Sequence, residues 1–291
     1  MRSSSLARVV ITGLAVSVVI TLGCSKPPTA PTPTPASQPS TPQQRAALAL
    51  FEAASVHMSV TTSPLNWASS NGKVTWTNGP CDFVGNGSVQ ATLDGGLAPT
   101  SGTFLPTGSH TYVVSFSNGL VNGGWGERAE LLNGVASAAY SVADWSNVTA
   151  TVSADSVRGV GLAHLSELWD VTADGSAVWT RVGSGSSPRT FTYTPATGSR
   201  LVNNLTTNVA AFRGGAYSVI LTDPVEQRFD NLKVAINGTE YTLNGSLVLR
   251  PGTSIYTGEV RITNNGTLVA RIYGGVGNAR TIEVLAPLVP L

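Results

Sequence analysis

Beyond Val60 the chain alternates apolar and polar residues over short stretches, and turn-forming glycine, asparagine or proline residues interrupt the alternation repeatedly. Alternation places every second side chain on the same face of a β-strand, and frequent turns favour antiparallel pairing. The pattern therefore predicts an all-β fold, an antiparallel meander that forms a sandwich, a half-barrel or a barrel. Segment 161–169 fits a strand or a helical turn. Expected strands include 73–77, 88–93, 111–117, 147–153, 177–182, 189–193, 216–222, 256–263, 267–273 and 280–285.

Two Asn-Gly dipeptides in residues 231–249 have different predicted roles. A two-residue turn at Asn237-Gly238 brings the apolar residues of both strands onto one face, which predicts a hairpin. Such a turn at Asn244-Gly245 scatters them, so Gly245 is expected inside a strand, at a bulge, a bend or a close approach of another strand. If its φ is negative, replacing Gly238 should damage folding more than replacing Gly245. The predicted hairpin pairs are Ile236 with Thr239, Val234 with Tyr241 and Leu232 with Leu243.

The same parity test predicts a three-residue loop at 264–266. This loop pairs Ile262 with Leu268 and requires a left-handed conformation at Gly266. Residues 131–142 repeat the Leu-Asn-Gly sequence inside an expected strand, with alternate residues up to Val142 on one face.

Two carboxylates precede Gly175 in an arrangement similar to the start of a calcium-binding loop. Asp170 and Asp174 are not followed by the remaining ligands of such a loop, including its closing glutamate. A hairpin turn at Asp174-Gly175, which pairs Val171 with Val178, explains the residues better.

Residues 41–58 carry the signals of one N-terminal amphipathic helix. Thr41 is a capping residue, Pro42 occupies the first helical position, and Gln44 completes a capping box. We expect the helix to end near His57 and to pack one apolar stripe on the sheet. The stripe consists of Ala47, Leu50, Phe51, Ala54 and Met58.

The first residues have the features of a secretory signal peptide. Arg2 and Arg8 supply positive charge, and the apolar run 9–22 is too short to be a permanent membrane span. The run ends in Leu22-Gly23-Cys24-Ser25, so one of the two cysteines of the chain follows it directly.

This sequence resembles the lipobox of bacterial lipoproteins, in which a small residue precedes a cysteine that is lipidated on its thiol. The resemblance covers about the first 25 residues. It implies that Cys24 becomes an acylated N-terminus that anchors the protein to a membrane, and Ser25 implies the outer membrane of a Gram-negative cell. The expected organisation is a signal peptide at 1–23, a tether rich in proline and threonine at 24–42, and a single β-rich domain at 43–291.

Charge excludes one class of partner. The chain has 17 basic and 16 acidic residues, and without Arg2 and Arg8 the mature chain has 15 basic residues against 16 acidic ones. Nucleic acid is therefore not an expected partner. If Cys24 carries lipid, Cys81 has no partner for an intramolecular disulfide and is expected to be a buried, inert thiol.

Candidate chemistry is sparse along the chain. His57, His110 and His164 lie far apart and show no metal-ligand spacing, so we expect neither a metal nor a cofactor. Trp125 lies in a glycine-rich stretch with Arg128 nearby, which makes the pair a candidate site for stacking on a sugar ring or another apolar ligand.

These features favour a lipid-anchored envelope protein that binds or scaffolds a glycan, a lipid or an envelope protein and is not an enzyme. Two alternatives make distinct structural predictions. A carbohydrate- or lipid-binding module should have a concave sheet face lined by aromatic side chains. An envelope hydrolase should have two carboxyl groups within roughly 5 to 10 Å of each other in a cleft.

Overall fold

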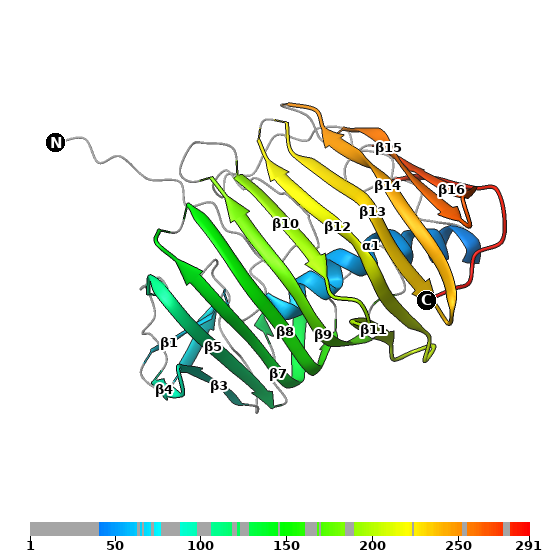
Figure 1. Ribbon diagram of the computed structural model, residues 1–291. Helices are drawn as coiled ribbons and strands as arrows, with labels where there is room; N and C mark the ends of the chain where they lie inside the picture. Colours follow the sequence, from blue (N-terminus) through cyan, green and yellow to red (C-terminus); the bar gives the residue numbers. More distant parts are fainter. Residues whose placement is uncertain are drawn as a thin grey trace, which may run out of the picture.

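Helix α1 (Pro42–Thr61) and strands β1 to β17 make up the regular structure of the described residues in a computed structural model (Figure 1). Within this described part, no helix has both the length and the hydropathy that a membrane span requires. The structure describes residues 41–62, 65, 67–70, 73–76, 88–97, 106–117, 121–122, 128–144, 146–160, 168, 170–183, 189–222, 224–251, 255–275 and 280–291. The strands are β1 (Trp67–Ser70), β2 (Lys73–Trp76), β3 (Ser88–Leu93), β4 (Gly96–Leu97), β5 (Gly108–Ser117), β6 (Val121–Asn122), β7 (Arg128–Val142), β8 (Asn147–Val160), β9 (Asp170–Val182), β10 (Arg189–Pro195), β11 (Arg200–Asn203), β12 (Val209–Leu221), β13 (Glu226–Ile236), β14 (Thr239–Leu249), β15 (Tyr256–Asn264), β16 (Thr267–Tyr273) and β17 (Thr281–Val284).

Helix α1 begins as the sequence predicts. The hydroxyl of Thr41 accepts a hydrogen bond from the backbone N–H of Gln44 at 3.1 Å, and the Gln44 side chain accepts one from the Thr41 N–H at 3.2 Å. The helix ends at Thr61, one turn later than expected. Its burial extends beyond the predicted stripe, because every residue from Ala46 to Thr61 except Glu52 is buried. An α-helix buried on all sides needs partners around its whole circumference.

The strands confirm the predicted antiparallel meander. All strands except the separate β1–β2 hairpin belong to one fifteen-stranded sheet, in which neighbours in sequence are mostly neighbours in space. β10 and β11 both lie between β9 and β12, so they act as two halves of one strand that is interrupted at 196–199. The strand order is β17-β16-β15-β14-β13-β12-β10-β9-β8-β7-β5-β3-β4.

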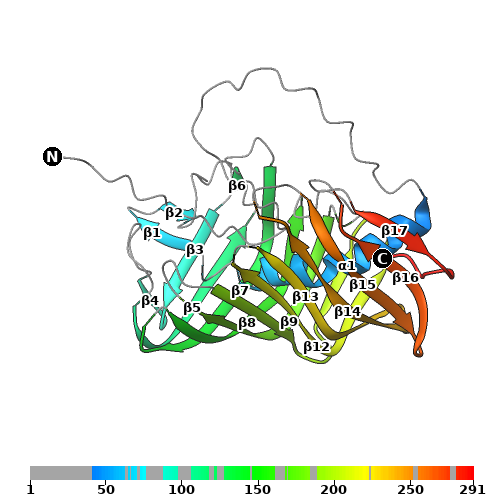
Figure 2. The same ribbon diagram turned by 90° about the horizontal axis from the view of Figure 1, so that it is seen from above.

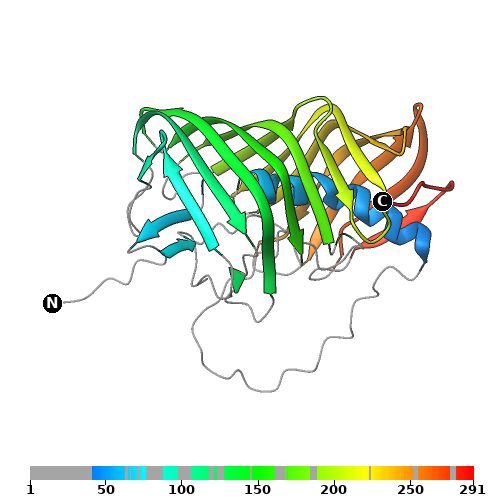
Figure 3. The same cartoon turned by 90° about the horizontal axis from the view of Figure 1, so that it is seen from below.

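A row of bulges crosses the long strands near their middles. Register shifts occur between β7 and β8, β8 and β9, β12 and β13, and β13 and β14, and a bulge bends the strand that carries it. The sheet is therefore folded into a trough, and α1 lies along the inside of it (Figures 2 and 3). We call the side that faces α1 the concave face. Residues with positive φ along this crease include Gly134, Ser156, Gly175, Gly198, Gly215, Asn231, Gly245 and Gly258.

The two Asn-Gly dipeptides have the roles predicted for them. β13 and β14 pair across Asn237-Gly238 in the predicted register, and Gly245 lies inside β14. However, Gly245 has a φ of +116°, and a Cβ there would collide with the carbonyl oxygen of Glu259 on β15, whereas a Cβ at Gly238 would meet nothing within 4 Å. The negative φ on which the ranking depended is therefore absent, and we expect Gly245 to be the more sensitive position.

The turn between β15 and β16 is shorter than predicted. Asn264 pairs with Thr267, which leaves a two-residue turn instead of the three-residue loop, although Gly266 has the expected positive φ of 78°. A bulge beside Ile262 then shifts the register by one residue, so Ile262 pairs with Ala270. The extra residue keeps the apolar side chains on one face, which the parity test alone could not distinguish from a longer loop.

The hairpin predicted at Asp174-Gly175 does not exist, because β9 runs through it from Asp170 to Val182. Val171 is fully buried and Val178 is 45% exposed, so the two valines point to opposite faces instead of pairing. Gly175 has a φ of +103°, and a Cβ there would lie 2.6 Å from the Cα of Ser199. The glycine thus provides the bend of the crease where β9 meets the interrupted strand.

Candidate functional site

Little of the predicted site lies within the described residues. Cys24 and Trp125 are outside them, as are Cys81 and His164. Arg128 opens β7, where its backbone pairs with Asn122 of β6, but its side chain is not described. The lipidation site and the proposed Trp125–Arg128 pair therefore stay predictions.

The concave face of the sheet is lined by aromatic side chains, as the binding-module alternative requires. Phe51 of α1 packs on Phe229 with ring centroids 5.0 Å apart, and Tyr217 lies 5.0 Å from the same ring. The helix thus occupies the middle of the face that an apolar ligand would otherwise fill. Buried aromatic residues on this face are Tyr112, Phe116, Tyr140, Tyr193, Phe212, Tyr217, Phe229, Tyr241 and Tyr256.

His57 is the most unusual group of this face, because the imidazole is fully buried. Its Nε2 lies 3.1 Å from the backbone carbonyl oxygen of Asp174, which can only accept, so Nε2 carries the proton. Nδ1 then accepts a hydrogen bond from the hydroxyl of Tyr193, and that hydroxyl lies 3.0 Å from Oγ1 of Thr61. The ring also packs on Phe212 at 5.0 Å between centroids.

Burial lowers the pKa of His57 to about 4, against the partly opposing effects of the Asp174 carbonyl and carboxylate. Burial also raises the pKa of the Tyr193 hydroxyl well above its usual range. Both groups are therefore neutral at pH 7, and the cluster joins the C-terminal half of α1 to β9 and β10 without a charge. This role could not be inferred from the sequence, since the partners of His57 are 117 and 136 residues away.

A second polar cluster joins α1 to the other half of the trough. The guanidinium carbon of Arg280 lies 4.1 Å from the centroid of the Tyr256 ring, in the geometry of a cation–π contact. Burial lowers the pKa of Arg280, while Tyr256 and Glu52 of α1 raise it. Burial likewise raises the pKa of Tyr217 beside them. The one charged residue on the buried part of the helix is thus compensated by a cation from the sheet.

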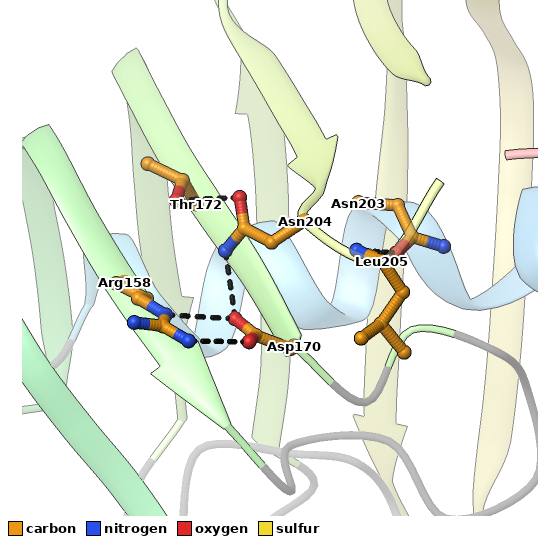
Figure 4. A network of polar contacts seen from close by, with 6 residues as sticks. All are labelled: Arg158, Asp170, Thr172, Asn203, Asn204 and Leu205. Atoms are coloured by element: carbon orange, nitrogen blue, oxygen red, sulfur yellow. Dashed lines mark hydrogen bonds and ion pairs between the residues drawn. The ribbon is translucent and has the colours of Figure 1, made fainter. Parts of the chain in front are cut away.

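Asp170 and Thr172, from the segment predicted to form a hairpin, instead belong to a polar network on the outer side of the sheet (Figure 4). Oδ1 of Asp170 accepts hydrogen bonds from Nε of Arg158 at 2.9 Å and from Nδ2 of Asn204 at 2.7 Å. Its Oδ2 accepts from Nη2 of Arg158 at 2.5 Å, and Thr172 donates to Asn204. Arg158 lowers the pKa of Asp170, although burial opposes this. An ionised, fully bonded carboxylate joins strands and cannot act as a general acid.

His110 forms an exposed pair with a carboxylate. Its Nδ1 lies 2.7 Å from Oδ2 of Asp94, and its Nε2 lies 3.0 Å from the carbonyl oxygen of Thr107. The hydrogen bond with Asp94 raises the pKa of His110 and lowers that of Asp94. Because both ring nitrogens face acceptors, the protonated imidazolium satisfies both, and neither nitrogen is free to take a proton from a substrate.

Comparisons with protein-family models, with curated proteins and with solved structures found no match for this chain. Its function is therefore argued from its own residues.

Proposed function

We propose that the chain is a lipid-anchored protein of the bacterial outer membrane whose curved β-domain binds or scaffolds an envelope partner. The anchor is acylated Cys24, on the strength of the Leu22–Ser25 sequence after an apolar run. The proline-rich stretch that follows provides an extended spacer of ~3.1 Å per residue.

One structural observation supports a mechanical link between the anchor and the domain. The tether ends at Thr41, and α1 begins at the next residue and is buried in the trough from Ala46 onward. Gln43 and Gln44 also bond to the backbone of the C-terminal segment, at Leu288 and Ile282. A pull on the tether is therefore transmitted directly to the core of the sheet, as a tethered scaffold requires.

Metabolic labelling with radioactive palmitate, followed by membrane fractionation, tests the anchor. We expect Cys24→Ser to lose the label and to leave the outer-membrane fraction, while the matched control Cys81→Ser keeps both. Label and membrane association that persist in Cys24→Ser would overturn the anchor. Sedimentation of the wild type with the inner membrane would overturn the proposed location.

A carbohydrate- or lipid-binding module is the second candidate, supported by Trp179, which is only partly buried, whereas the other aromatic residues of the concave face are buried. In this proposal Trp125 and Arg128 contact the ligand. Glycan-array and lipid-overlay profiles should weaken in Trp125→Ala and stay unchanged in Tyr273→Phe, which changes an aromatic residue on the outer face of the sheet. Identical profiles for the native protein and Trp125→Ala would exclude Trp125 from the site.

A further inference from the structure

Two arginines lie side by side on the concave face, near the end of β9 and the start of β10. Arg181 of β9 is directly opposite Phe191 of β10, and residues directly opposite share a face. Arg189 precedes Phe191 by two residues, so its side chain points to the same face. The two guanidinium groups are thus diagonal neighbours on the wall of the trough.

The surroundings of these arginines are apolar. Arg181 is flanked across the strands by Val148 on one side and by Phe191 on the other, and Arg189 is opposite Leu221. Trp179 packs on Phe191 with ring centroids 5.9 Å apart. Two partly exposed cations of the same sign therefore lie next to each other in an apolar part of the concave face, where an anion would stabilise both.

No carboxylate provides that compensation among the residues that the structure describes. Nε of Arg181 is buried and has no hydrogen-bond acceptor there. Burial lowers the pKa of Arg181, and the positive charge of Arg189 lowers it further. Other arginines of the sheet face carboxylates, namely Arg158 with Asp170, Arg200 with Asp174, Arg228 with Glu226, Arg261 with Glu259 and Arg271 with Glu283.

We propose that Arg181 and Arg189 bind the phosphate group of a phosphate ester, whose apolar part packs on the partly exposed Trp179. Guanidinium groups hold phosphate oxygens through paired, charge-assisted hydrogen bonds, and buried donors without partners are rare unless a ligand or water satisfies them. The phosphate belongs either to a lipid headgroup or to a free phosphate compound. The inference rests on the proposed binding function, but it does not depend on the lipid anchor.

The site is compatible with the helix in its observed position. Arg189 precedes Tyr193, which bonds to His57 of α1, by four residues on the same strand. At ~3.3 Å per residue the two Cα atoms are about 13 Å apart along β10. A phosphate can therefore bind the arginine pair while α1 keeps its contacts with the sheet.

Isothermal titration calorimetry on the purified full chain tests the site with two probes. One probe is inorganic phosphate, and the other is a short-chain phosphatidylglycerol below its micelle-forming concentration. We expect R181Q/R189Q to bind at least tenfold more weakly than the wild type, because both paired contacts are lost. The control R228Q/R261Q removes the same charge from the outer face and should bind within twofold of the wild type.

The probes also separate the two sources of phosphate. Tighter binding of phosphatidylglycerol by tenfold or more supports a lipid headgroup, and equal binding of inorganic phosphate supports a free phosphate compound. Absence of binding of either probe to the wild type, or equal binding to R181Q/R189Q, would overturn the site. Either result leaves the palmitate-labelling test of the anchor unaffected, so the two proposals fail independently.

The melting temperature gives a second readout that a purely structural role would not produce. We expect saturating phosphate to raise the melting temperature of the wild type but not that of R181Q/R189Q. Without phosphate, R181Q should melt no lower than the wild type, because it removes a half-buried charge whose charged neighbour has the same sign. A lower melting temperature of R181Q, combined with no effect of phosphate on the wild type, would assign the arginines a structural role instead.

Discussion

Mild acid should destabilise the fold through His57, because the buried imidazole resists protonation. Its pKa is lowered by burial from the ordinary value of 6.5 to about 4. In the unfolded chain the same ring titrates near 6.5, so between these two values the unfolded state binds a proton that the folded state does not. The difference of 2.5 pKa units corresponds to about 3 kcal/mol at 1.36 kcal/mol per unit.

The sign of this effect follows from which state binds the proton. Above pH 6.5 the ring is neutral in both states and the full stability is present. As the pH falls from 6.5 to about 4, the free energy of unfolding decreases by roughly 1.4 kcal/mol per pH unit, and below about 4 the decrease stops. The lowered pKa values of Asp94, Asp144 and Asp170 begin to reduce stability only below about pH 5, and they act equally on the wild type and on His57→Gln.

His110 acts in the opposite direction and above the window. Its raised pKa means that the stability from its pair with Asp94 is fully present below pH 6.5 and is lost as the pH rises through the folded-state pKa. Between pH 6.5 and 4 its contribution is therefore constant. Of the described histidines, only His57 binds more protons in the unfolded state than in the folded state over this range.

Urea unfolding of the wild type and His57→Gln, followed by circular dichroism at pH 7, 6, 5 and 4, measures the effect. A glutamine can donate to the Asp174 carbonyl and accept from Tyr193, as the neutral imidazole does, but it does not titrate. We expect the wild type to lose about 3 kcal/mol more than the variant between pH 7 and pH 4. The reasoning is refuted if both proteins lose stability in parallel across this range, whatever their difference at pH 7.

Three further changes test the fold. Gly245→Ala should lower the free energy of unfolding by on the order of 3 kcal/mol or more, and Gly238→Ala should lower it by about 1 kcal/mol. Urea midpoints that rank the two variants in the opposite order would contradict the close approach in β14. Phe51→Ala should lower the free energy of unfolding by about 3 to 5 kcal/mol, because it leaves a cavity against Phe229. A decrease below about 1 kcal/mol would show that α1 is not packed in the trough. Thr41→Ala should cost about 1 kcal/mol through loss of the N-cap, and thermal unfolding that is indistinguishable from the wild type would argue against the capping box.

The strands were predictable wherever burial alone selects the register. Across Asn237-Gly238 only one turn length places every apolar residue on the buried face, and the observed pairs follow it. At 264–266 two solutions place Val260, Ile262 and Ala270 on the buried face, namely a three-residue loop and a two-residue turn with a bulge. They differ at the bulge, where Val269 is buried and Leu268 is partly exposed. At Asp174-Gly175 the local sequence fits a turn, and the continuous strand is decided by the approach of Ser199, which is distant in sequence.

The contacts of the polar groups on the concave face could not be predicted from the sequence. His57 looked isolated because Tyr193 and Asp174 come together only when the sheet folds around α1. The arginine pair was not predictable either, because alternation along one strand does not fix the face of the next strand. Only the observed pairing of Arg181 with Phe191 shows that Arg181 and Arg189 share a face.

The bend of the sheet and the burial of α1 on all sides require each other. A flat sheet covers one side of a helix, which needs only one apolar stripe, whereas a sheet folded along its middle surrounds the helix and needs apolar or small residues around it. Helix α1 meets that requirement, since alanines at 46, 49 and 53 lie outside the predicted stripe and are buried. The in-strand glycines at 134 and 245 supply the bends. An all-round apolar helix, followed by strands with Leu-Asn-Gly in their interiors, is therefore a sequence pattern that predicts a trough rather than a sandwich.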